Sequence, residues 1–536
     1  MKITLQDVSQ TEEIQKTLSL SHLCAKVLAA KQLDYKQISQ ILSAPVLQDP
    51  MNAYHMKEVV ERLHKAKAEK EKVLVCGDYD ADGICATTIL FDALRRYGIS
   101  CGFYIPDRFK QGYGLHPDTV AMADDKGYTL LITVDNGVKA FDALKEAKRR
   151  GLDVIVTDHH DMKEEEVDAL VVLHPFTMGE EFQYLSGAGV ALEISRALLG
   201  DIKEHIVLAC VASIADVMQL KNETRDIVRL GISYLAQGEC KPIQALANDR
   251  YPQWEETMIA FQVVPKLNVM GRLADMVNVN NMVRYLLLRK ADEIQRVSAQ
   301  INALNDQRKK MSNEMVETAK SLIHPEYSFQ MLFHESFHEG IVGLVAGKIA
   351  EEIKQPVMVL SKHEESLKGS IRSQGYLDLT TFFDGCMDVL DSYGGHKAAA
   401  GIGFSLDNKQ SVQDYMNTYA EENMVEREED YEVIAVSLPE IGIAQVESLK
   451  ALKPFGEGFK EPLFYLKDVP VTQIKTMGNG AHVKWVLNDE SEAILFQDRK
   501  AYETFSERKT MNFIGTVSIN RFMGKKKVNL FVKEAF

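Results

Sequence analysis

The sequence has few cysteines and little glycine and proline. Its seven cysteines are scattered, and no two form a C-x-x-C pair, which argues against a disulfide framework and favours reduced thiols. Glycine (33) and proline (14) make up about 9% of the chain, less than usual, which excludes long low-complexity linkers. No stretch approaches the roughly 18 apolar residues of a membrane helix, and the first residues, MKITLQDVSQ, lack a leader pattern. We expect a soluble, cytoplasmic protein without a membrane partner.

Positive charge is also in short supply. The chain has 62 Lys and Arg against 77 Asp and Glu, for a net charge of −15 and a pI near 5.5. A chain this acidic does not coat nucleic acid nonspecifically, so any such binding must come from local basic patches. At about 150 residues per domain, 536 residues indicate three or four domains, which excludes a single small binding module.

Short apolar runs that end in polar clusters dominate the first half of the chain. They are VLVCGDYDADG from Val73, LLITVDNG from Leu130 and VIVTDHHD from Val154. Helical stretches such as CATTILFDALRRYG and KAFDALKEAKRRG lie between them. This alternation predicts βαβ units and a buried parallel sheet. Ligands of such sheets bind beyond the carboxyl ends of the strands, where acids and histidines gather in this chain.

The remaining pattern predicts two more folded regions. Apolar residues spaced by three and four predict a long helix that joins two lobes. A second α/β unit follows, and five short alternating strands after the acidic stretch 421–430 predict a small antiparallel barrel. We therefore expect an N-terminal segment of short helices (1–55), a first α/β domain (56–289), the connecting helix (290–322), a second α/β domain (323–425) and the barrel (430–536).

Carboxylates and histidines follow three successive predicted strands. Asp78, Asp80 and Asp82 alternate in GDYDADG, Asp135 follows the next strand, and Asp158, His159 and His160 follow the third. Four carboxylates close together repel one another strongly unless cations neutralise them. Carboxylate oxygens mixed with imidazole nitrogens suit Mn²⁺ or Mg²⁺ better than structural Zn²⁺. Two such ions ~3.5–4 Å apart can lower the pKa of a shared water and hold a phosphoryl group.

GDYDADG on its own has an alternative interpretation, an acidic turn or an EF-hand calcium loop. The EF-hand requires a Glu six residues after its Gly, where this chain has Ile89. A lone Asp135 or His159 would more often be a cap or a satisfied polar residue. Their occurrence at consecutive strand ends favours a metal site.

In order and spacing, GDYDADG, TVDNG, VTDHHD and SIADVMQL resemble the four motifs of the DHH phosphoesterase superfamily. GGHKAAAG resembles the signature of the companion DHHA1 domain, and the barrel preceded by LKPFGEGFKEPLF resembles the part that distinguishes RecJ single-strand-specific exonucleases from shorter relatives. The resemblance runs from about residue 70 to the end. It implies an α/β fold with a DHH parallel-sheet lobe and a DHHA1 lobe joined by the long helix, followed by an OB-like β-barrel.

The resemblance also implies individual roles. The ligands of two Mn²⁺ or Mg²⁺ ions would be Asp80, Asp82, Asp135, His159 and Asp216, with Asp135 bridging, while Asp78 at the edge and His160 near the scissile phosphate would serve catalysis. Some superfamily members have a histidine four residues before the position of Asp80, where this chain has Cys76. Either Cys76 takes no part in metal binding, or one ion is weakly held.

Cations and hydroxyls for holding phosphates occur in several motifs. By resemblance, phosphates near a 5′ end would be bound by Arg108, Arg272, Ser370 and Arg372, with arginine forks binding oxygens bidentately. The glycines of SYGGHKAAAG would let backbone N–H groups approach an anion at the start of a helix, with His396 and Lys397 facing the substrate. A tight packed turn is the alternative for this segment.

The barrel contains a basic run without an acid. Its members are Arg521, Lys525, Lys526, Lys527 and Lys533, interleaved with Phe522 and Phe531. Such a run is either a solvated hairpin or a surface that tracks a single strand with basic groups and stacks its bases on aromatic rings. The resemblance favours DNA binding.

Together these features imply a 5′-to-3′ exonuclease that degrades single-stranded DNA to 5′-mononucleotides by two-metal-ion hydrolysis, in DNA repair and recombination. The family implies a helicase and a single-strand-binding protein as partners. Two alternatives stay open. One is a phosphodiesterase for short oligoribonucleotides or cyclic dinucleotides, which shares the two-lobed core but normally lacks the barrel. The other is a non-catalytic replication scaffold, against which the intact set of acids argues.

Overall fold

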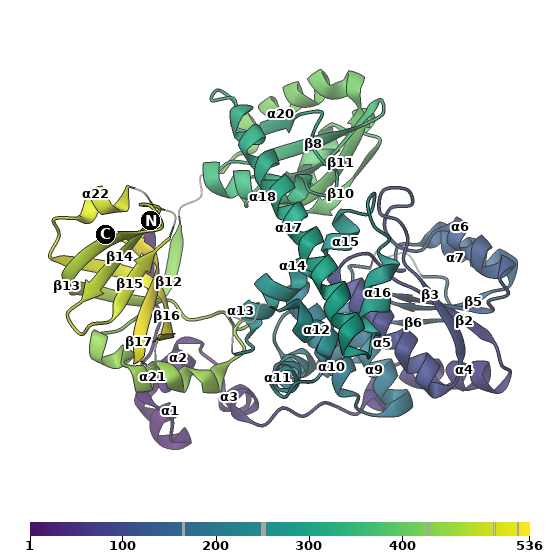
Figure 1. Ribbon diagram of the computed structural model, residues 1–536, viewed down its shortest axis with the longest axis horizontal. Helices are drawn as coiled ribbons and strands as arrows, with labels where there is room; N and C mark the ends of the chain where they lie inside the picture. Colours follow the sequence, from purple (N-terminus) through teal and green to yellow (C-terminus); the bar gives the residue numbers. More distant parts are fainter. Residues whose placement is uncertain (163–166, 248–252, 426–428, 497, 499, 523–524) are drawn as a thin grey trace. The chain divides into compact units, whose positions relative to one another are not determined.

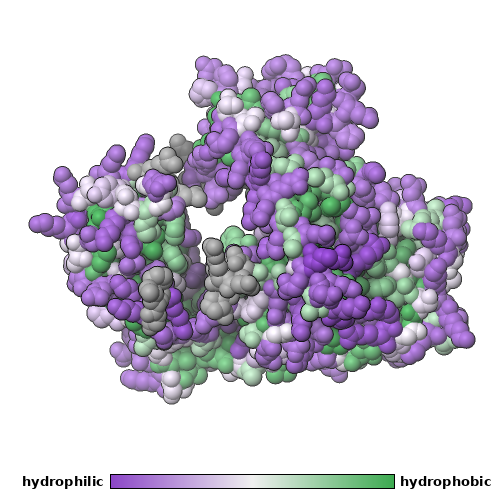
Figure 2. Space-filling model, in the orientation of Figure 1, coloured by the Kyte–Doolittle hydropathy of each residue, from purple (hydrophilic) through white to green (hydrophobic). Residues whose placement is uncertain are grey.

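The computed structural model describes residues 1–162, 167–247, 253–425, 429–496, 498, 500–522 and 525–536 (Figure 1). The chain divides into two compact units. Unit 1 comprises Met1–Leu47, Gln219–Arg229 and Glu428–Phe536, and unit 2 comprises Gln48–Met218 and Leu230–Arg427. Most of the face shown in Figure 2 is hydrophilic, with apolar residues in separate patches. Among the described residues, no helix is long and apolar enough to cross a membrane.

The first lobe of unit 2 contains the predicted parallel sheet. Its strands lie in the order β3 (Ser100–Tyr104), β2 (Lys72–Cys76), β4 (Leu130–Val134), β5 (Asp153–Thr157) and β6 (Val171–Leu173). All four pairings are parallel. The three central strands are almost entirely buried, as expected of a sheet covered by helices on both faces.

Helices cover both faces of this sheet. Helices α6 (Pro117–Asp125) and α7 (Phe141–Arg150) pack on a core that includes Leu74, Leu131 and Val156. Helices α5 (Ala81–Tyr97) and α9 (Gly187–Leu199) pack against each other and on the strands (Figure 1). The other helices of the lobe are α4 (Met56–Ala68), α8 (Pro175–Met178), α10 (Lys203–Ala215), α12 (Lys241–Leu246), α13 (Glu256–Met258), a π-helix (Ile259–Val263), α14 (Val264–Leu267), α15 (Val269–Arg272) and α16 (Asn280–Leu286).

A single helix of 31 residues, α17 (Ala291–Ser321), joins the first lobe to the second, as predicted. Its apolar stripe packs into the protein, with Ile294, Ile301 and Met315 buried. The second lobe follows with a sheet in the order β10 (Ser392–His396), β11 (Ala399–Ser405), β9 (Ser366–Arg372), β8 (Val357–His363) and β7 (Gln330–Phe333). Helices α18 (Val342–Ile353), α19 (Leu379–Phe382) and α20 (Lys409–Asn423) pack with it.

The glycine-rich segment SYGGHKAAAG departs from the expectation of a helix start. It forms the antiparallel hairpin of β10 and β11, in which Gly394 pairs with Gly401. A side chain at Gly395 would bring its Cβ to 2.3 Å from the carbonyl oxygen of Ala399, so the glycine permits close approach of the two strands. The glycines therefore serve strand pairing rather than a helix N-terminus.

The C-terminal region of unit 1 is the predicted five-stranded barrel. Its strands follow the order β13 (Phe464–Met477), β14 (His482–Leu487), β15 (Glu492–Leu495), β17 (Lys525–Ala535) and β16 (Thr510–Phe522), and pairing of β13 with β16 closes the barrel. Trp485, Phe464 and Phe513 fill its interior. Helices α21 (Ile443–Ser448) and α22 (Ala501–Phe505) accompany it. Of the acidic stretch 421–430, residues 426–428 lie outside the described part.

The N-terminal segment packs with the barrel in unit 1 and contains a strand that the sequence pattern did not predict. Helices α1 (Thr11–Leu18), α2 (His22–Ala30) and α3 (Tyr35–Leu42) form as expected. Before them, β1 (Lys2–Leu5) pairs in parallel with β12 (Asp430–Ala435), which continues to β13. The expectation of helices alone was wrong here because a four-residue strand is defined by its partner, which lies far away in the sequence.

One internal segment also belongs to unit 1. Residues Gln219–Arg229 include the start of α11 (Asn222–Ala236). The guanidinium of Arg225 donates hydrogen bonds to the carbonyl oxygens of Leu452 (2.8 Å) and Pro454 (3.0 Å) and lies 4.8 Å from the centre of the Phe459 ring. The segment is thus fixed to the chain that leads into the barrel.

Candidate active site

Three neighbouring strands deliver the predicted metal ligands to one edge of the first sheet. The GDYDADG loop follows β2, Asp135 follows β4, and His159 follows β5. Asp216 caps the C-terminus of α10 at the same place. The structure forms three groups whose ligand atoms lie within 4.8 Å of one another: Asp78, Asp80 and Asp135; Asp82, His159 and Asp216; and Asp135, His159 and His160.

The imidazole of His159 lies among three carboxylates. Its Nε2 is 3.1 Å from Asp135 Oδ1, 3.5 Å from Asp216 Oδ2 and 3.6 Å from Asp82 Oδ2. Burial lowers the pKa of His159, which favours the neutral ring that binds metals. Burial and the charge of Asp82 raise the pKa of Asp216 to about 8. The pKa of Asp135 is raised well above its usual value by burial and by the charges of neighbouring acids.

Two buried oxygens in this cluster test whether the site suits divalent ions. Among the described residues, Asp78 Oδ1 and Asp135 Oδ1 accept no hydrogen bond, although both are inaccessible to solvent. A buried carboxylate oxygen without a donor is costly unless a cation contacts it. Oxygen atoms left unpaired beside a neutral imidazole therefore fit a pair of Mn²⁺ or Mg²⁺ ions.

Backbone groups hold the acids in place. Asp82 accepts hydrogen bonds of 2.7 Å from the N–H groups of Gly187 and Ala188, the first residues of α9. Asp80 caps α5 by accepting from the N–H of Gly83 at 3.0 Å. A Cβ at Gly187 would lie 2.5 Å from Asp135 Cβ, so only glycine allows α9 to approach the cluster this closely.

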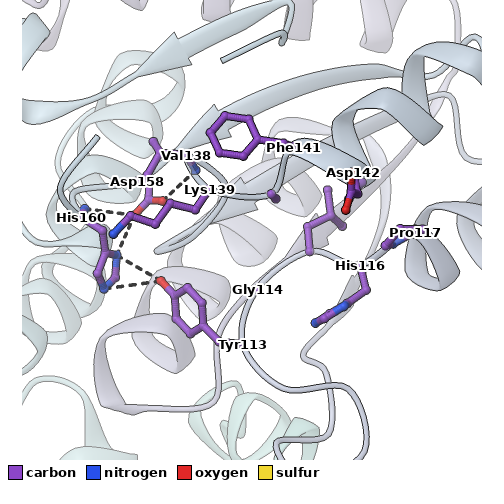
Figure 3. A pocket seen from close by; sticks show the side chains of 14 residues that line it. Tyr113, Gly114, His116, Pro117, Val138, Lys139, Phe141, Asp142, Asp158 and His160 are labelled. Carbon is purple, nitrogen blue, oxygen red and sulfur yellow. Dashed lines mark hydrogen bonds and ion pairs between the residues drawn. The ribbon is translucent and has the colours of Figure 1, made fainter. Parts of the chain in front are cut away.

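His160 is oriented by two neighbours. Its Nδ1 lies 2.8 Å from Asp158 Oδ1 and 3.0 Å from the hydroxyl of Tyr113 (Figure 3). The Tyr113 hydroxyl also donates to the carbonyl oxygen of Asp135 at 2.7 Å. Burial lowers the pKa of His160, but the hydrogen bond and charge of Asp158 outweigh it and the pKa is raised. Asp158 is itself buried and accepts from the N–H groups of Val138 and His159. It is a positioning residue that the resemblance did not assign.

Cys76 lies away from these ligands. Its side chain is buried in the apolar core beneath α6 and α7, and burial raises the pKa of the thiol to about 12. No group of described residues that could hold a metal includes it. This favours the first of the two alternatives, in which Cys76 takes no part in metal binding.

Four arginines gather beside the acidic cluster. Burial, followed by the charges of Arg108, Arg308 and Arg372, lowers the pKa of Arg272 to about 10. Arg108 lies 5.0 Å from the centre of the Tyr79 ring, and Arg372 donates to the hydroxyl oxygen of Ser370 at 2.6 Å. Within the described chain, none of the four pairs with a carboxylate, and Arg308 Nε is buried without an acceptor. We call Arg108, Arg272, Arg308 and Arg372 the arginine cluster.

Arg308 was not predicted from the sequence and lies in the middle of α17, within the polar stretch NDQRKK. No local signal distinguishes it from the neighbouring lysines, because only the packing of α17 brings it to Arg272. His396 and Lys397 are exposed at the tip of the β10–β11 hairpin. There Lys397 lies 3.5 Å from Asp378, which is not a predicted site residue.

In the folded barrel, glutamates partly neutralise the positive charge of the basic run. Arg521 and Lys526 face each other across the β16–β17 hairpin, and Glu447 lies 3.1 Å from the first and 2.7 Å from the second. Lys527 lies 3.9 Å from Glu492, while Lys525 is exposed. The side chain of Phe522 lies outside the described part. The hairpin is therefore less basic than its sequence indicates.

A second feature of the barrel was predicted only in part, because the sequence pointed to Phe531 but not to the two rings beside it. The rings of three aromatic residues lie close together: His482 of β14, Phe496 directly after β15, and Phe531 of β17. Ring centroids are 5.1 Å apart for His482 and Phe496 and 5.9 Å apart for Phe496 and Phe531. Phe496 is 50% exposed and Phe531 37% exposed. Cross-strand pairs of Lys475 with Lys484, Lys484 with Ile494 and Ile494 with Phe531 place lysines on the same face. We call His482, Phe496 and Phe531 the aromatic platform.

Comparison with known proteins agrees with the three regions. Family models match the DHH family N-terminal domain over residues 72–226, the DHHA1 domain over 326–422 and the RecJ OB domain over 434–534. The fold and the site thus define a DHH phosphoesterase of the two-lobed type with an added OB barrel.

The most informative relatives are RecJ proteins. The single-stranded-DNA-specific exonuclease RecJ of Salmonella typhimurium is 31% identical over 76% of this chain and 76% of its own length. That of Bacillus subtilis is 29% identical over 99% of this chain and 70% of its own length. The crystal structure of RecJ from Thermus thermophilus in complex with Mn²⁺ has a TM-score of 0.86 and 25% identity, covering 100% of this chain and 80% of that one. The chain belongs to the RecJ family of single-stranded-DNA-specific exonucleases.

Proposed function

We propose that this protein is a metal-dependent exonuclease that degrades single-stranded DNA in the 5′-to-3′ direction and releases 5′-mononucleotides. The observation that carries the proposal is the convergence of five candidate ligands beside a cluster of arginines. Among the residues that the structure describes, buried oxygens of Asp78 and Asp135 accept no hydrogen bond, and the four arginines have no carboxylate partner. Unpaired anions next to unpaired cations are what a site for divalent ions and a phosphodiester requires.

Two ions, Mn²⁺ or Mg²⁺, would supply an activated water and positive charge at the phosphoryl group. Asp82, His159 and Asp216 would hold one of them, and Asp80 would hold the other with Asp78 at its edge. Asp135 belongs to the group with Asp78 and Asp80, and its Oδ1 lies 3.1 Å from His159 Nε2, so it could contribute to holding both ions. The structure of Thermus thermophilus RecJ with Mn²⁺ supports this choice of cofactor.

The protein's own groups position the substrate. His160, oriented by Asp158 and Tyr113, can donate a hydrogen bond to an oxygen of the scissile phosphate. The arginine cluster, with Ser370, binds the phosphate at the 5′ end, since planar guanidinium groups bind phosphate oxygens bidentately. Fixing the 5′ end next to the cleavage site gives the reaction its direction.

The barrel would hold the rest of the single strand. Exposed aromatic rings allow bases to stack, and Lys475 on the same face can neutralise the backbone, whereas the neighbouring Lys484 already lies 3.2 Å from Glu492. We infer that the enzyme acts in the cytoplasm in DNA repair and recombination, on strands that a helicase opens and a single-strand-binding protein covers. The barrel also favours the exonuclease over a phosphodiesterase for short or cyclic substrates, which would not require this surface.

Incubation of the purified protein with 5′- and 3′-labelled single-stranded and duplex DNA tests the proposal. With Mn²⁺ or Mg²⁺, we expect labelled mononucleotide to appear first from 5′-labelled single strands, and a chelator to stop the release. First release from the 3′ label, equal activity on duplex DNA or activity in chelator would contradict it. Preferential cleavage of a cyclic dinucleotide would favour the phosphodiesterase.

A further inference from the structure

A cavity adjoins His160 and is not used by the roles described above. Its volume is about 280 Å³, and it is enclosed by the segment from Tyr113 to Pro117, the loop from Gly137 to Ala140 and the start of α7 (Figure 3). Asp158 and His160 form one wall, so the cavity opens next to the proposed position of the scissile phosphate. It lies entirely within the first lobe.

Two aromatic rings line this cavity. The ring of Tyr113 is fixed by its hydroxyl group, which contacts Asp135 and His160, and the residue is 43% exposed. Phe141, half-buried, is the first residue of α7. Figure 3 shows these two rings on different sides of the cavity. Accessible aromatic faces at a concave site are suited to a flat ring that stacks on them.

Polar groups with unused hydrogen-bonding capacity complete the lining. His116 also lines the cavity, although its Nε2 is shielded from solvent and so does not face the open space. Lys139 is exposed and extends toward His160 in Figure 3. Helix α7 begins without a side-chain cap, so its first N–H groups also lack a side-chain acceptor. A flat ring joined to an anion would suit the aromatic rings together with Lys139 and the start of α7.

We propose that the cavity receives the base of the nucleotide on the 3′ side of the scissile phosphate, an inference that rests on the proposed exonuclease function. The arginine cluster occupies the other side: Arg108 stacks on Tyr79, and Tyr79 packs edge-on against Tyr113 with centroids 6.5 Å apart. The departing nucleotide is bound through its 5′ phosphate at the arginine cluster. The cavity beyond Tyr113 is therefore free to receive the base of the next nucleotide. A volume just below the ~300 Å³ of ordinary ligand pockets fits one base.

Single abasic sites in the substrate test this assignment. Steady-state kinetics would be measured on 5′-phosphorylated single strands that are intact or carry one abasic residue at position 1, 2 or 3 from the 5′ end. For the unchanged protein, we expect the abasic residue at position 2 to raise KM about tenfold for removal of the first nucleotide, because one stacked base is lost. Phe141→Ala should raise KM on intact DNA by about the same factor and show no further rise with the abasic residue at position 2.

Matched variants separate stacking from loss of folding. Phe91→Ala removes a half-buried phenylalanine of the same lobe that packs on Phe103 at 4.9 Å, away from the cavity, and should keep the full response to position 2. Phe141→Tyr should restore KM, and His116→Ala should raise it without altering kcat greatly.

Two results would overturn the inference. One is an unchanged response to the abasic residue at position 2 in both Phe141→Ala and His116→Ala. The other is a rise in KM with the abasic residue at position 1 that the unchanged protein shows and both variants lack. That result would place the departing base in the cavity. If the unchanged protein released no nucleotide from any strand, the proposed function would fail, and that outcome is distinguishable from both.

Discussion

The acidic cluster of the first lobe and the basic hairpin of the barrel respond to folding in opposite ways. At strand ends, folding concentrates Asp78, Asp82 and Asp135, and none of them forms an ion pair with a lysine or arginine of the described chain. In the hairpin, folding brings Glu447 to Arg521 and Lys526. Charge that stays uncompensated after folding indicates a place for a ligand, whereas charge that is paired contributes mainly to the surface. By this criterion, the arginine cluster resembles the acidic cluster rather than the hairpin.

The largest effect should come from the acidic cluster. Asp135→Asn removes the charge shared by two candidate groups and should lower nucleotide release to roughly a thousandth or less, with DNA binding nearly unchanged. Because one of several repelling carboxylates is gone, the melting temperature of the metal-free variant should rise. A control is Asp118→Asn, an acid in the first turn of α6, which should alter neither property. Full activity of Asp135→Asn would refute the metal assignment.

Removal of the metal should produce an equally large loss of activity with the opposite effect on stability. Chelator should abolish release by the unchanged protein and lower its melting temperature, because ions that bind only the folded state stabilise it by about 2.7 kcal/mol at one hundred times Kd. Asp135→Asn should lose most of this dependence. Calorimetry with and without Mn²⁺ measures it, and equal shifts in both proteins would place the ions elsewhere.

The arginine cluster should give an intermediate effect. Arg308→Ala should raise KM about tenfold on 5′-phosphorylated strands and much less on 5′-hydroxyl strands, since a bidentate charged contact is worth about 1.5–3 kcal/mol. Lys309→Ala, whose exposed side chain pairs with Asp306, is the matched control. Similar losses on both kinds of end would assign Arg308 to folding rather than to phosphate binding.

Within the barrel, the aromatic platform should matter more than the hairpin. Phe496→Ala should weaken single-strand binding about tenfold, whereas Lys526→Ala should weaken it about twofold because Glu447 already offsets its charge. Glu447→Gln should strengthen binding slightly and steepen its salt dependence. Fluorescence anisotropy at several salt concentrations measures the binding affinity of each variant. A greater loss of affinity for Lys526→Ala than for Phe496→Ala would contradict the prediction.

The smallest effect concerns pH. In metal-free protein the pKa of Asp216 is raised to about 8 from a usual 3.8, so the folded state retains a proton that the unfolded chain releases. This retained proton stabilises the folded state at low pH, and the stabilisation is lost as pH rises through about 8. The melting temperature should therefore fall by a few degrees between pH 6 and pH 8.5. Asp216→Asn should flatten this dependence, and an unchanged slope would contradict the assignment.

The sequence permits prediction where contiguous residues determine the structure. Three of the four acidic motifs directly follow a buried strand, and parallel strands bring their carboxyl ends to one edge, so Asp80, Asp135 and His159 could be grouped from the residue pattern alone. Asp216 instead follows helix α10. The long helix and the barrel were predictable for the same reason, because periodicity is a local property.

The features that escaped prediction depend on contacts between distant residues. Arg308 acquires its environment only from the packing of α17, and Phe496 meets Phe531 only through the register of β15 with β17. The strand β1 exists because β12 pairs with it. The glycine-rich hairpin was misread because glycines serve anion binding and close strand approach equally well, and only pairing across β10 and β11 separates the two.

The position of residues Gln219–Arg229 has a practical consequence for dissecting this enzyme. A chain shortened before Leu452 would deprive Arg225 of two carbonyl acceptors and would leave Leu220 without the carbonyl of Glu457. Leu220, the first residue to lose a contact, follows the candidate ligand Asp216 by only four residues in the sequence. Inactivity of such a fragment would report a broken framework as readily as a missing DNA contact. Point substitutions of exposed barrel residues, such as Phe496 and Lys526, therefore measure the contribution of the barrel to DNA binding without disturbing this framework.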